Sequence, residues 1–384
     1  MKNMELIKSF GLDSLSSLVS AAYDLGDGET LLCFDYDRVR EFCCALVGLG
    51  WRAAKHFSLG NTDGTFYEHE SGRTMYVYTN SGVPFARAVL GARLAADDAF
   101  VGEQIYNDTV FYQVYNNPKT GGGMTYLVRT KDGRFIVIDG GFSLDGEGLL
   151  RVMSELHPLA DESQPYDVAA WIVTHPHNDH IELLKRITDD DAVMSRLNIK
   201  RMYASLPTAE TLRGVDNDVI PDNEWMRGCL ERLRAHGCKI VKPYAGMRYK
   251  IGELTMNIYY TQAEWRFIDM KTVNDASIVF SLTRDGGKTV LIPGDIMDRA
   301  AKYIMTMYTD EQLHADVVQV AHHALIGPDI KFYEAIKPKI CLWPIGLRGY
   351  GYTQYPSITE RNDKLHRMDV INCVACFGPT QIVI

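Results

Sequence analysis

The sequence predicts a layered α/β fold in which two β-sheets pack face to face and helices cover their outer surfaces. Apolar strand segments occur in blocks along the chain, and amphipathic helical segments separate the blocks. The chain has 384 residues, of which 46% are apolar, so it can bury a large core and is not expected to be disordered. This length suits two or three domains.

The first region, residues 1–104, is predicted to be a small α+β domain. A helix near the start precedes the strand TLLCFDY, a second helix spans about residues 37–48, and short strands follow at AAKHFSLG, GTFYEHE and RTMYVYTN. No motif in this region carries chemistry, and we interpret His56 and His69 as structural or surface residues. Its role stays open between a cap over an active-site cleft, a surface for homo-oligomer formation and a partner-binding surface.

The second region, residues 105–384, holds the strand blocks. Three strands, TVFYQVYN, MTYLVRT and RFIVIDGG, precede a helix at about 146–156 and the strand DVAAWIVT. Further helices are predicted near 223–236 and 358–367. Further strands are predicted at IKRMYASL, KIVKPY, MRYKI, LTMNIYYT, SIVFSLT, TVLIPGD, DVVQVAHH, KICLWPIG, VINCVACF and TQIVI.

Charge and composition argue against several classes of protein. The net charge of −9 argues against non-specific binding to nucleic acid or to anionic membranes. The N-terminus has no apolar run of the signal-peptide kind, and no window reaches the roughly 20 apolar residues of a membrane span. We therefore expect a cytoplasmic protein with no membrane partner. The eight cysteines are scattered, and Cys373 and Cys376 fall in a predicted strand, so we expect reduced thiols.

One segment has a strong local charge. From Trp225 to Lys250, seven basic residues face one acid. A solvated helix face and a basic rim that attracts an anionic substrate both explain this pattern, and the sequence leaves the choice open.

The stretch THPHNDH, residues 174–180, predicts a metal centre. His175 and His177 leave an apolar strand as alternate residues, so they share a side, and Asp179 and His180 lie at the turn into the helical segment IELLKRI. Imidazole and carboxylate ligands suit Zn²⁺, and also Mn²⁺ or Fe. Two more strand ends carry ligand-type residues, Asp295 after LIPG and the pair His322-His323 after VVQVA.

These residues in this order resemble the metallo-β-lactamase superfamily over about residues 107–384. The resemblance implies an αββα sandwich with the N-terminal domain as an addition. It also implies that Asp139, in VIDGG, supports the metal loop without binding metal itself. Within the superfamily, THPHNDH, NDASIVFSL, LIPGD and VVQVAHHAL most resemble the free-standing and channel-attached hydrolase domains of DNA-uptake competence proteins.

The sequence departs from that pattern in three places. The family usually continues DHxGG, whereas Glu182 and Leu183 stand here after Ile181, and HHGS has become His323-Ala324-Leu325. A further histidine ligand is common in the family. The one histidine between residues 180 and 295 is His236, which we do not expect to reach the site.

The resemblance implies two metal ions. One would be held by His175, His177 and a bridging Asp295. The other would be held by Asp179, His180, Asp295 and His322. His323 is the alternative to His322 as ligand, or a hydrogen-bond donor to the substrate. Tyr355 is either a donor to a substrate oxygen or a packed aromatic residue.

The predicted function is two-metal hydrolysis of a small anionic or ester substrate, a phosphodiester first and a lactone or thioester next. Asp179 is expected to orient the attacking group. Nucleic acid is a less favoured substrate because of the acidic net charge. Two other classes are a non-catalytic metal sensor or partner-binding protein, which the missing glycines keep open, and a flavin-linked diiron protein, which His177 disfavours because a carboxylate is typical there.

Overall fold

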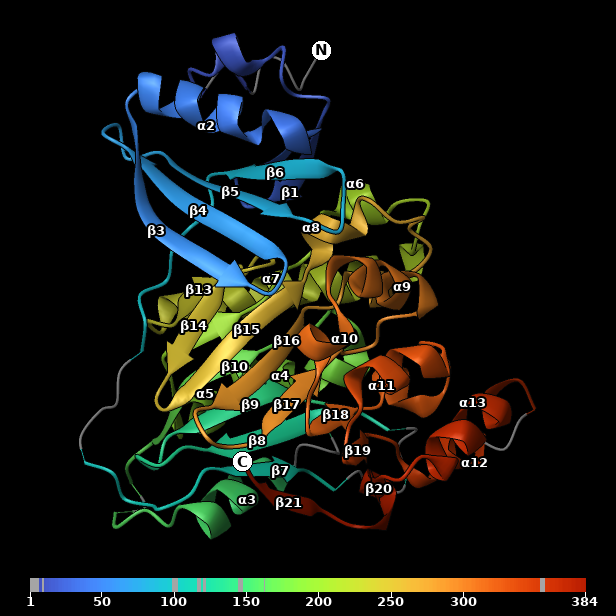
Figure 1. The fold of residues 1–384 in the computed structure, drawn as a ribbon. Helices are drawn as coiled ribbons and strands as arrows, with labels where there is room; N and C mark the ends of the chain where they lie inside the picture. The colour runs from blue at the N-terminus through green and yellow to red at the C-terminus, as the bar shows by residue number, and fades with distance from the viewer. Residues whose placement is uncertain are drawn as a thin grey trace.

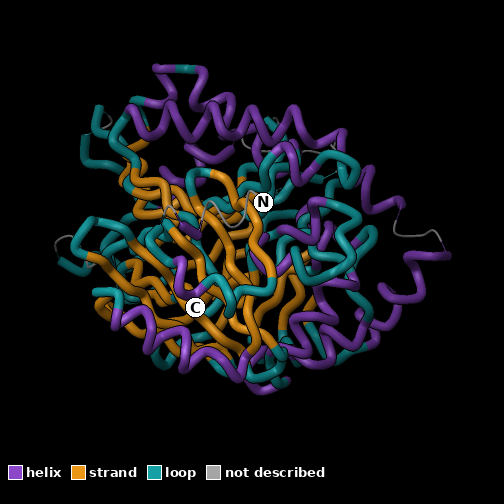
Figure 2. Tube along the Cα trace, turned by 90° about the horizontal axis from the view of Figure 1, so that it is seen from above, coloured by secondary structure: helices purple, strands orange, loops and turns teal. Residues whose placement is uncertain are grey.

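The computed structural model describes residues 7–8, 10–98, 103–115, 119, 122–143, 148–161, 163–352 and 356–384. Two large β-sheets pack face to face, with helices on the outside, and a third sheet lies at the N-terminal end (Figure 1). The predicted mixed α/β sandwich with an added N-terminal sheet is therefore confirmed. In the view from above, helices surround the central strands (Figure 2).

The first sheet of the sandwich has eight strands in the order β13-β12-β10-β9-β8-β7-β21, with β11 beside β10. Strands β9, β10, β12 and β13 run parallel, and β7, β8 and β21 pair antiparallel. The bounds are β7 Val110–Gln113, β8 Thr125–Arg129, β9 Phe135–Asp139, β10 Tyr166–Ile172, β11 Leu197–Ile199, β12 Arg201–Tyr203, β13 Lys239–Val241 and β21 Thr380–Val383.

The second sheet has seven strands in the order β14 to β20. It begins with antiparallel pairs and continues from β17 to β20 as parallel strands. The bounds are β14 Arg248–Ile251, β15 Leu254–Tyr260, β16 Val279–Arg284, β17 Thr289–Ile292, β18 Val317–Gln319, β19 Ile340–Trp343 and β20 Ile371–Val374.

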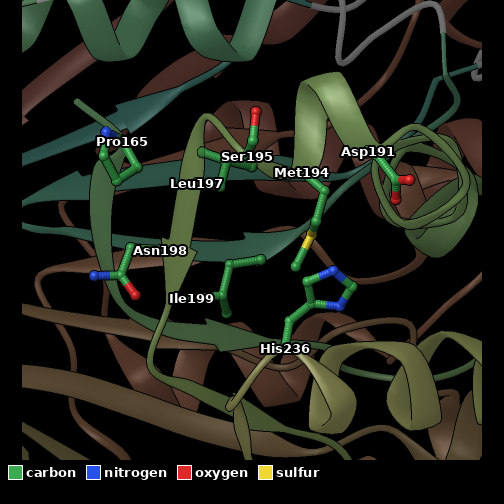
Figure 3. A pocket seen from close by; sticks show the side chains of 8 residues that line it. All are labelled: Pro165, Asp191, Met194, Ser195, Leu197, Asn198, Ile199 and His236. Atoms are coloured by element: carbon green, nitrogen blue, oxygen red, sulfur yellow. The ribbon is translucent and has the colours of Figure 1, made fainter. Parts of the chain in front are cut away.

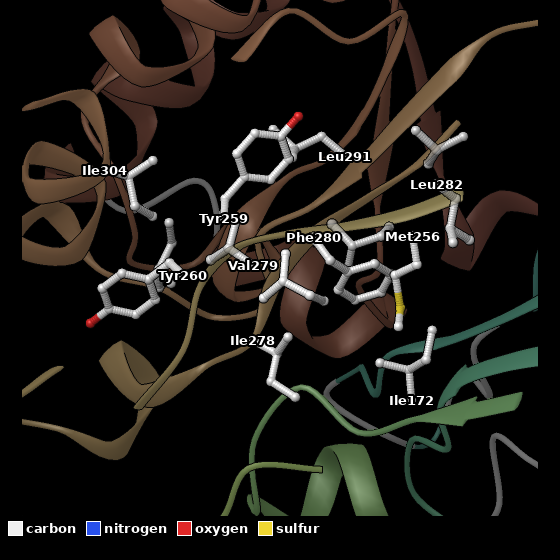
Figure 4. Close-up of a cluster of buried hydrophobic side chains, with 14 of the residues drawn as sticks. Ile172, Met256, Tyr259, Tyr260, Ile278, Val279, Phe280, Leu282, Leu291 and Ile304 are labelled. Carbon is white, nitrogen blue, oxygen red and sulfur yellow. The ribbon is translucent and has the colours of Figure 1, made fainter. Parts of the chain in front are cut away.

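Strand alternation divides the core into two layers. In β9, Ile136 and Ile138 join the cluster between the sheets, whereas Phe135 and Val137 join the cluster under the helices of the first sheet. Between the sheets, Ile172 of β10 lies near the side chains of the second sheet (Figure 4). Apolar residues on both faces explain why these strands are continuous apolar runs in the sequence.

Helices cover both outer faces. Near the first sheet lie α3 Leu149–Leu156, α4 Asn178–Asp189, α5 Asp191–Met194, α6 Ala209–Leu212 and α7 Ile220–Ala235. On the second sheet, α9 Asp298–Met307 and α11 Ile330–Ile336 bury Ile304 and Phe332 in the central cluster. The remaining helices are α8 Gln262–Trp265, α10 Asp310–Leu313, α12 Leu347–Tyr352 and α13 Pro356–Arg367.

The N-terminal sheet has six antiparallel strands in the order β1-β2-β6-β5-β4-β3. The bounds are β1 Ala21–Gly26, β2 Glu29–Asp35, β3 Trp51–Leu59, β4 Thr62–His69, β5 Thr74–Asn80 and β6 Phe85–Leu90, with α2 at Val39–Gly48. Strands β1 and β6 were not predicted from the sequence. Both are short, and β6 carries Arg87 in the middle of its apolar residues, which conceals the pattern.

The two faces of the N-terminal sheet have different partners. One face packs on α2, where the rings of Phe34 and Phe42 stack at 4.3 Å, and the other face joins the central cluster of the sandwich. The contact with the sandwich includes buried polar groups. Arg87 Nε lies 3.6 Å from Glu264 Oε1, both side chains are fully buried, and Arg87 donates to the Tyr303 hydroxyl at 2.7 Å. The boundary near residue 104 stays a prediction, because the core is continuous across it.

Several local expectations can be compared with the structure. Most of the predicted first helix lies outside the described residues, and Asp13–Leu15 forms a 3₁₀ turn. The strand expected at VINCVACF ends at Val374, and Cys376 lies buried in a 3₁₀ turn, because β20 is a short edge strand. All eight cysteines are unpaired. Within the described ranges no helix has the length and apolarity of a membrane span.

Three of the seven basic residues of this segment form ion pairs, and the other four are exposed. Arg227 pairs with Asp27 at 3.3 Å, Arg232 with Asp189 at 2.9 Å and Lys242 with Glu29 at 3.2 Å. These three charges are neutralised by acidic partners, so the structure favours a structural role for them over a basic rim.

We expect Arg87→Met to lower the free energy of unfolding by about 3–5 kcal/mol, because it leaves the buried Glu264 carboxylate without its cation. Chemical denaturation measures the change. The matched control is Arg38→Met, which removes the exposed Arg38–Glu41 pair and should cost less than about 1 kcal/mol. A similar small loss in both variants would contradict the structural role of the buried pair.

Candidate metal centre

The stretch THPHNDH joins strand β10 to helix α4, as the sequence analysis expected. The strand ends at Ile172 and the helix begins at Asn178. His175 and His177 therefore lie in the loop, and Asp179 and His180 lie in the first turn of the helix. His175 and His180 are buried, and His177 and Asp179 are partly exposed.

Asp139 anchors this loop from the end of β9. Its Oδ1 accepts the Thr174 backbone N–H at 2.7 Å, and its Oδ2 accepts the Thr174 hydroxyl at 2.7 Å. His180 Nδ1 also lies 2.7 Å from Asp139 Oδ2. This bond turns His180 Nε2 toward the other candidate ligands, which is the supporting arrangement that the resemblance implied for Asp139.

Four candidate ligands converge around Asp295. Asp295 Oδ2 lies 3.2 Å from His180 Nε2, 3.3 Å from His323 Nε2 and 4.0 Å from His175 Nε2. His323 Nε2 is also 3.2 Å from Asp179 Oδ2. His323 Nδ1 donates to the Pro344 carbonyl at 2.6 Å, which leaves its Nε2 for the cluster.

The geometry suits divalent cations. His175, His180 and Asp295 form one group of candidate ligand atoms within 4.8 Å of one another, and Asp179, His180 and His323 form a second. Asp295 Oδ1 is buried and makes no hydrogen bond to any described residue. His177 Nδ1 lies 3.0 Å from His175 Nε2, at the open side of the cluster. An unpartnered buried carboxylate oxygen among imidazole nitrogens is the donor set that a metal ion satisfies.

His323, not the expected His322, faces the other candidate ligands. We expected the first histidine after the strand to point inward. However, β18 already ends at Gln319, and His322, His323 and Ala324 have φ of 53°, 53° and 61°. This left-handed turn reverses which side chain points inward. His322 Nε2 instead lies 3.5 Å from Asn274 Nδ2, and its buried Nδ1 has no hydrogen-bond partner among the described residues.

The loop that carries Asp295 is held by the conformation of Gly294 and by hydrogen bonds to Ser277 and Asp275. The roles of Ser277 and Asp275 were not predicted from the sequence. Gly294 has φ of 63°, and a Cβ there would lie 2.9 Å from the Ser277 hydroxyl. The Asp295 backbone N–H donates to that hydroxyl at 3.2 Å, and Met297 N–H donates to Asp275 Oδ1 at 2.7 Å. In the sequence, the polar turn NDAS before the strand IVFSL was the signal that could have indicated Asp275 and Ser277.

The residues after His180 do not fill the metal centre. Ile181, Leu183 and Leu184 are buried in the apolar cluster under the first sheet. The Glu182 carboxylate accepts the Ser143 backbone N–H at 3.0 Å. Gly140, which follows β9, permits close packing against Leu183, since a Cβ at Gly140 would lie 3.2 Å from Leu183 Cβ. The loss of the family's glycines is therefore accommodated away from the candidate ligands.

Two other residues were considered from the sequence, Tyr355 and His236. Tyr355 lies outside the described residues. His236 lines a separate pocket of about 370 Å³ with Met194 and Asp191 (Figure 3), and its Nδ1 lies 2.9 Å from the Arg232 carbonyl oxygen. As expected, His236 does not join the cluster.

The cluster is strongly coupled electrostatically. Burial opposes charge on every member, but the carboxylates of Asp295, Asp139 and Asp179 outweigh burial and raise the pKa of His180 to about 10. Asp295 and Asp179 also raise the pKa of His323 against the effect of burial. Burial and the neighbouring His180 hold the pKa of His175 well below its usual value. Without metal, these carboxylates therefore favour protonation of His180 and of His323.

Comparison with known proteins points to one superfamily. Residues 118–236 match the family model described as the metallo-beta-lactamase superfamily. With the two-sheet sandwich and the placement of the ligand-type residues, the match supports this superfamily and the metallo-β-lactamase fold. No curated protein matches the chain.

Solved structures of similar fold are distant. The metallo-beta-lactamase fold protein YhfI from Bacillus subtilis is 13% identical, with a TM-score of 0.41, over 72% of this chain and 100% of that one. Unliganded yeast PDE1 is 13% identical, with a TM-score of 0.44, over 72% and 100%. CmlA, a diiron beta-hydroxylase from Streptomyces venezuelae, is 13% identical, with a TM-score of 0.38, over 72% and 54%. Similarities at this level do not indicate a substrate.

We expect metal affinity to rise with pH from about 6 to 9, because a metal ion must displace protons from the raised-pKa imidazoles of His180 and His323. Calorimetric titration of Zn²⁺ into metal-free protein, in two buffers of different ionisation enthalpy, measures the protons released. Binding that releases no proton and does not change with pH would contradict this protonation state.

We expect His323→Ala to lose bound metal and His322→Ala to retain it, because only the His323 ring faces Asp179 and Asp295. Metal content per chain after supplementation and dialysis measures the difference. The two variants are matched controls for each other, since they remove the same ring at adjacent positions. Loss of metal in His322→Ala alone would reverse the assignment.

Proposed function

We propose that this protein is a metal-dependent hydrolase that acts on a phosphodiester or a similar small ester with two divalent ions, Zn²⁺ being the first choice. The observation that carries the proposal is the buried cluster in which the Nε2 atoms of three histidines converge on two carboxylates. This donor set provides several protein ligands, and the partly exposed His177 lies where a coordination position can stay open to water or substrate.

The family resemblance suggests which residues would hold each ion, with His323 in place of His322. His175, His177 and Asp295 would hold one ion, and Asp179, His180, His323 and Asp295 would hold the other. These residues would thereby provide a bound water of lowered pKa and a polarised oxygen in the bond under attack, which is the chemistry that divalent ions supply.

Other side chains of the protein would orient the ligands and the attacking water and donate a hydrogen bond to the substrate. Asp139 holds the His180 ring in place through Nδ1. Asp179 would accept a hydrogen bond from the attacking water and so orient it. His322 fits the role of donor to the substrate. Burial lowers the pKa of His322, so its ring is neutral, and its Nε2 faces the Asn274 amide. The Nδ1–H is then the donor that lacks a partner and can serve the substrate or leaving-group oxygen.

The substrate class rests on charge and on resemblance. The competence-type likeness of the motifs favours a phosphodiester, and the net charge of −9 favours a small substrate over a long nucleic acid. A lactone or thioester would use the same centre. The non-catalytic alternative rests on the missing glycines, and turnover that depends on metal would exclude it.

We expect the metal-loaded protein to hydrolyse bis-p-nitrophenyl phosphate, and Asp295→Asn to lower kcat about a hundredfold or more, because Asp295 faces three of the imidazoles. Release of p-nitrophenol measures the rate. Asp285→Asn, at an exposed turn, is the matched control and should keep full activity.

A panel containing a lactone and a thioester separates the ester classes. Fewer than one metal ion per chain after supplementation, together with no turnover on any ester of the panel, would exclude the two-metal hydrolase. A steep salt dependence of DNA binding would instead favour a nucleic-acid substrate.

A further inference from the structure

A groove of about 400 Å³ lies between α4 and α7, beside the candidate metal centre. Glu182 and Lys185 of α4 and Trp225 of α7 line it. Glu182 lies about one turn of helix after Asp179, so the groove begins next to the candidate ligands.

Helix α7, which forms the other wall of the groove, also lies near the metal centre. Asp222 lies about one turn before Trp225 on α7. Burial raises the pKa of Asp222, and the charges of His177, Asp179 and Glu182 act on it as well, so its carboxyl group lies near the open side of the centre. Both helices therefore run from the candidate ligands into the groove.

The acidic side chains of the groove are already engaged. Glu182 accepts the Ser143 N–H, Asp189 pairs with Arg232 at 2.9 Å, and Asp190 accepts the Ala192 N–H at 3.0 Å. Asp189 is thus paired with a cation, and the carboxylates of Glu182 and Asp190 each hold a backbone N–H.

Lys185 differs from these acids. Its ammonium lies 4.1 Å from the centre of the Trp225 ring, and no carboxylate in the described parts of the chain pairs with it. Trp225 Nε1 is buried and has no hydrogen-bond partner in the same parts of the chain. A half-buried cation on an aromatic face and an unused N–H donor thus line one groove.

We propose that this groove binds a second anionic group of the substrate, held by Lys185 above Trp225, while the scissile ester lies at the metal centre. This proposal rests on the proposed hydrolase function. Lys185 follows Asp179 by six residues, an axial rise of roughly 9 Å along the helix, so the second anion is separate from the scissile group. The substrate class is thus a small ester with a terminal carboxylate or phosphate some six bonds or more from the bond that is cleaved.

Matched substrates test the proposal. We would compare p-nitrophenyl hexyl phosphate with analogues whose hexyl chain ends in a carboxylate or in a phosphate. For Lys185→Met, which keeps the aliphatic stem, we expect KM for the charged analogues to rise about tenfold with kcat nearly unchanged, and KM for the neutral analogue to stay constant. Lys185→Arg should restore most of the loss, and Lys331→Met, an equal charge change at an exposed site on α11, should have no effect. The two charged analogues show whether carboxylate or phosphate is preferred.

A binding measurement separates failure of this proposal from failure of the hydrolase function. Trp225 is the one partly exposed tryptophan of the five, so tryptophan fluorescence reports on the groove without turnover. Hexane-1,6-bisphosphate should change the fluorescence of the wild type more strongly than hexyl phosphate does, and Lys185→Met should abolish the difference. Hydrolysis with an unchanged KM for the charged analogues in Lys185→Met, or a fluorescence response equal for both phosphates, would overturn the anionic subsite alone. A fluorescence difference without any hydrolysis would support the groove and refute the function.

Discussion

The arrangement of the centre depends on the buried carboxylate of Asp139. This group receives the Thr174 N–H, the Thr174 hydroxyl and His180 Nδ1, and so ties the end of one strand to the loop and helix that follow the next strand. A fully buried carboxylate is unfavourable unless its oxygens are hydrogen bonded, so the three bonds form together or not at all. The direction of the His180 ring, and hence the place where Asp295 and His323 meet it, follows from this anchor.

The two sheets then supply ligands from opposite sides. The first sheet contributes the loop after β10, and the second contributes the loops after β17 and β18. Because the sheets pack through a buried apolar core, these strand ends have little freedom to move apart. The N-terminal sheet extends this rigidity, since Arg87 reaches Tyr303 on α9, the helix that begins shortly after Asp295. The N-terminal sheet thus contacts the helix that follows the loop of a candidate ligand.

The sandwich, most of its strands and the residues that gather at the centre were predictable from the sequence. Apolar runs buried on both faces and ligand-type residues at strand ends are local signals. Backbone direction at the histidine pair was not predictable, because neither residue is a glycine and nothing local indicates three successive left-handed residues. The role of Glu182 was also hidden, since its partner, the Ser143 N–H, lies 39 residues away. The contact of the N-terminal sheet depends on the buried pair of Arg87 with Glu264, two charged residues that composition alone assigns to the surface.

Ala324 occupies a left-handed position where the related motif has glycine, and the backbone keeps that conformation without glycine's freedom. Two side chains of α13 account for this, because Arg361 and Asn362 both donate to the Ala324 carbonyl, at 2.7 and 2.9 Å. The conformational preference that glycine would have supplied by itself is here imposed by a distant helix. Arg361 and Asn362 therefore help to keep the backbone conformation that orients His323. A change at position 324 and a change at position 361 or 362 should be inherited together.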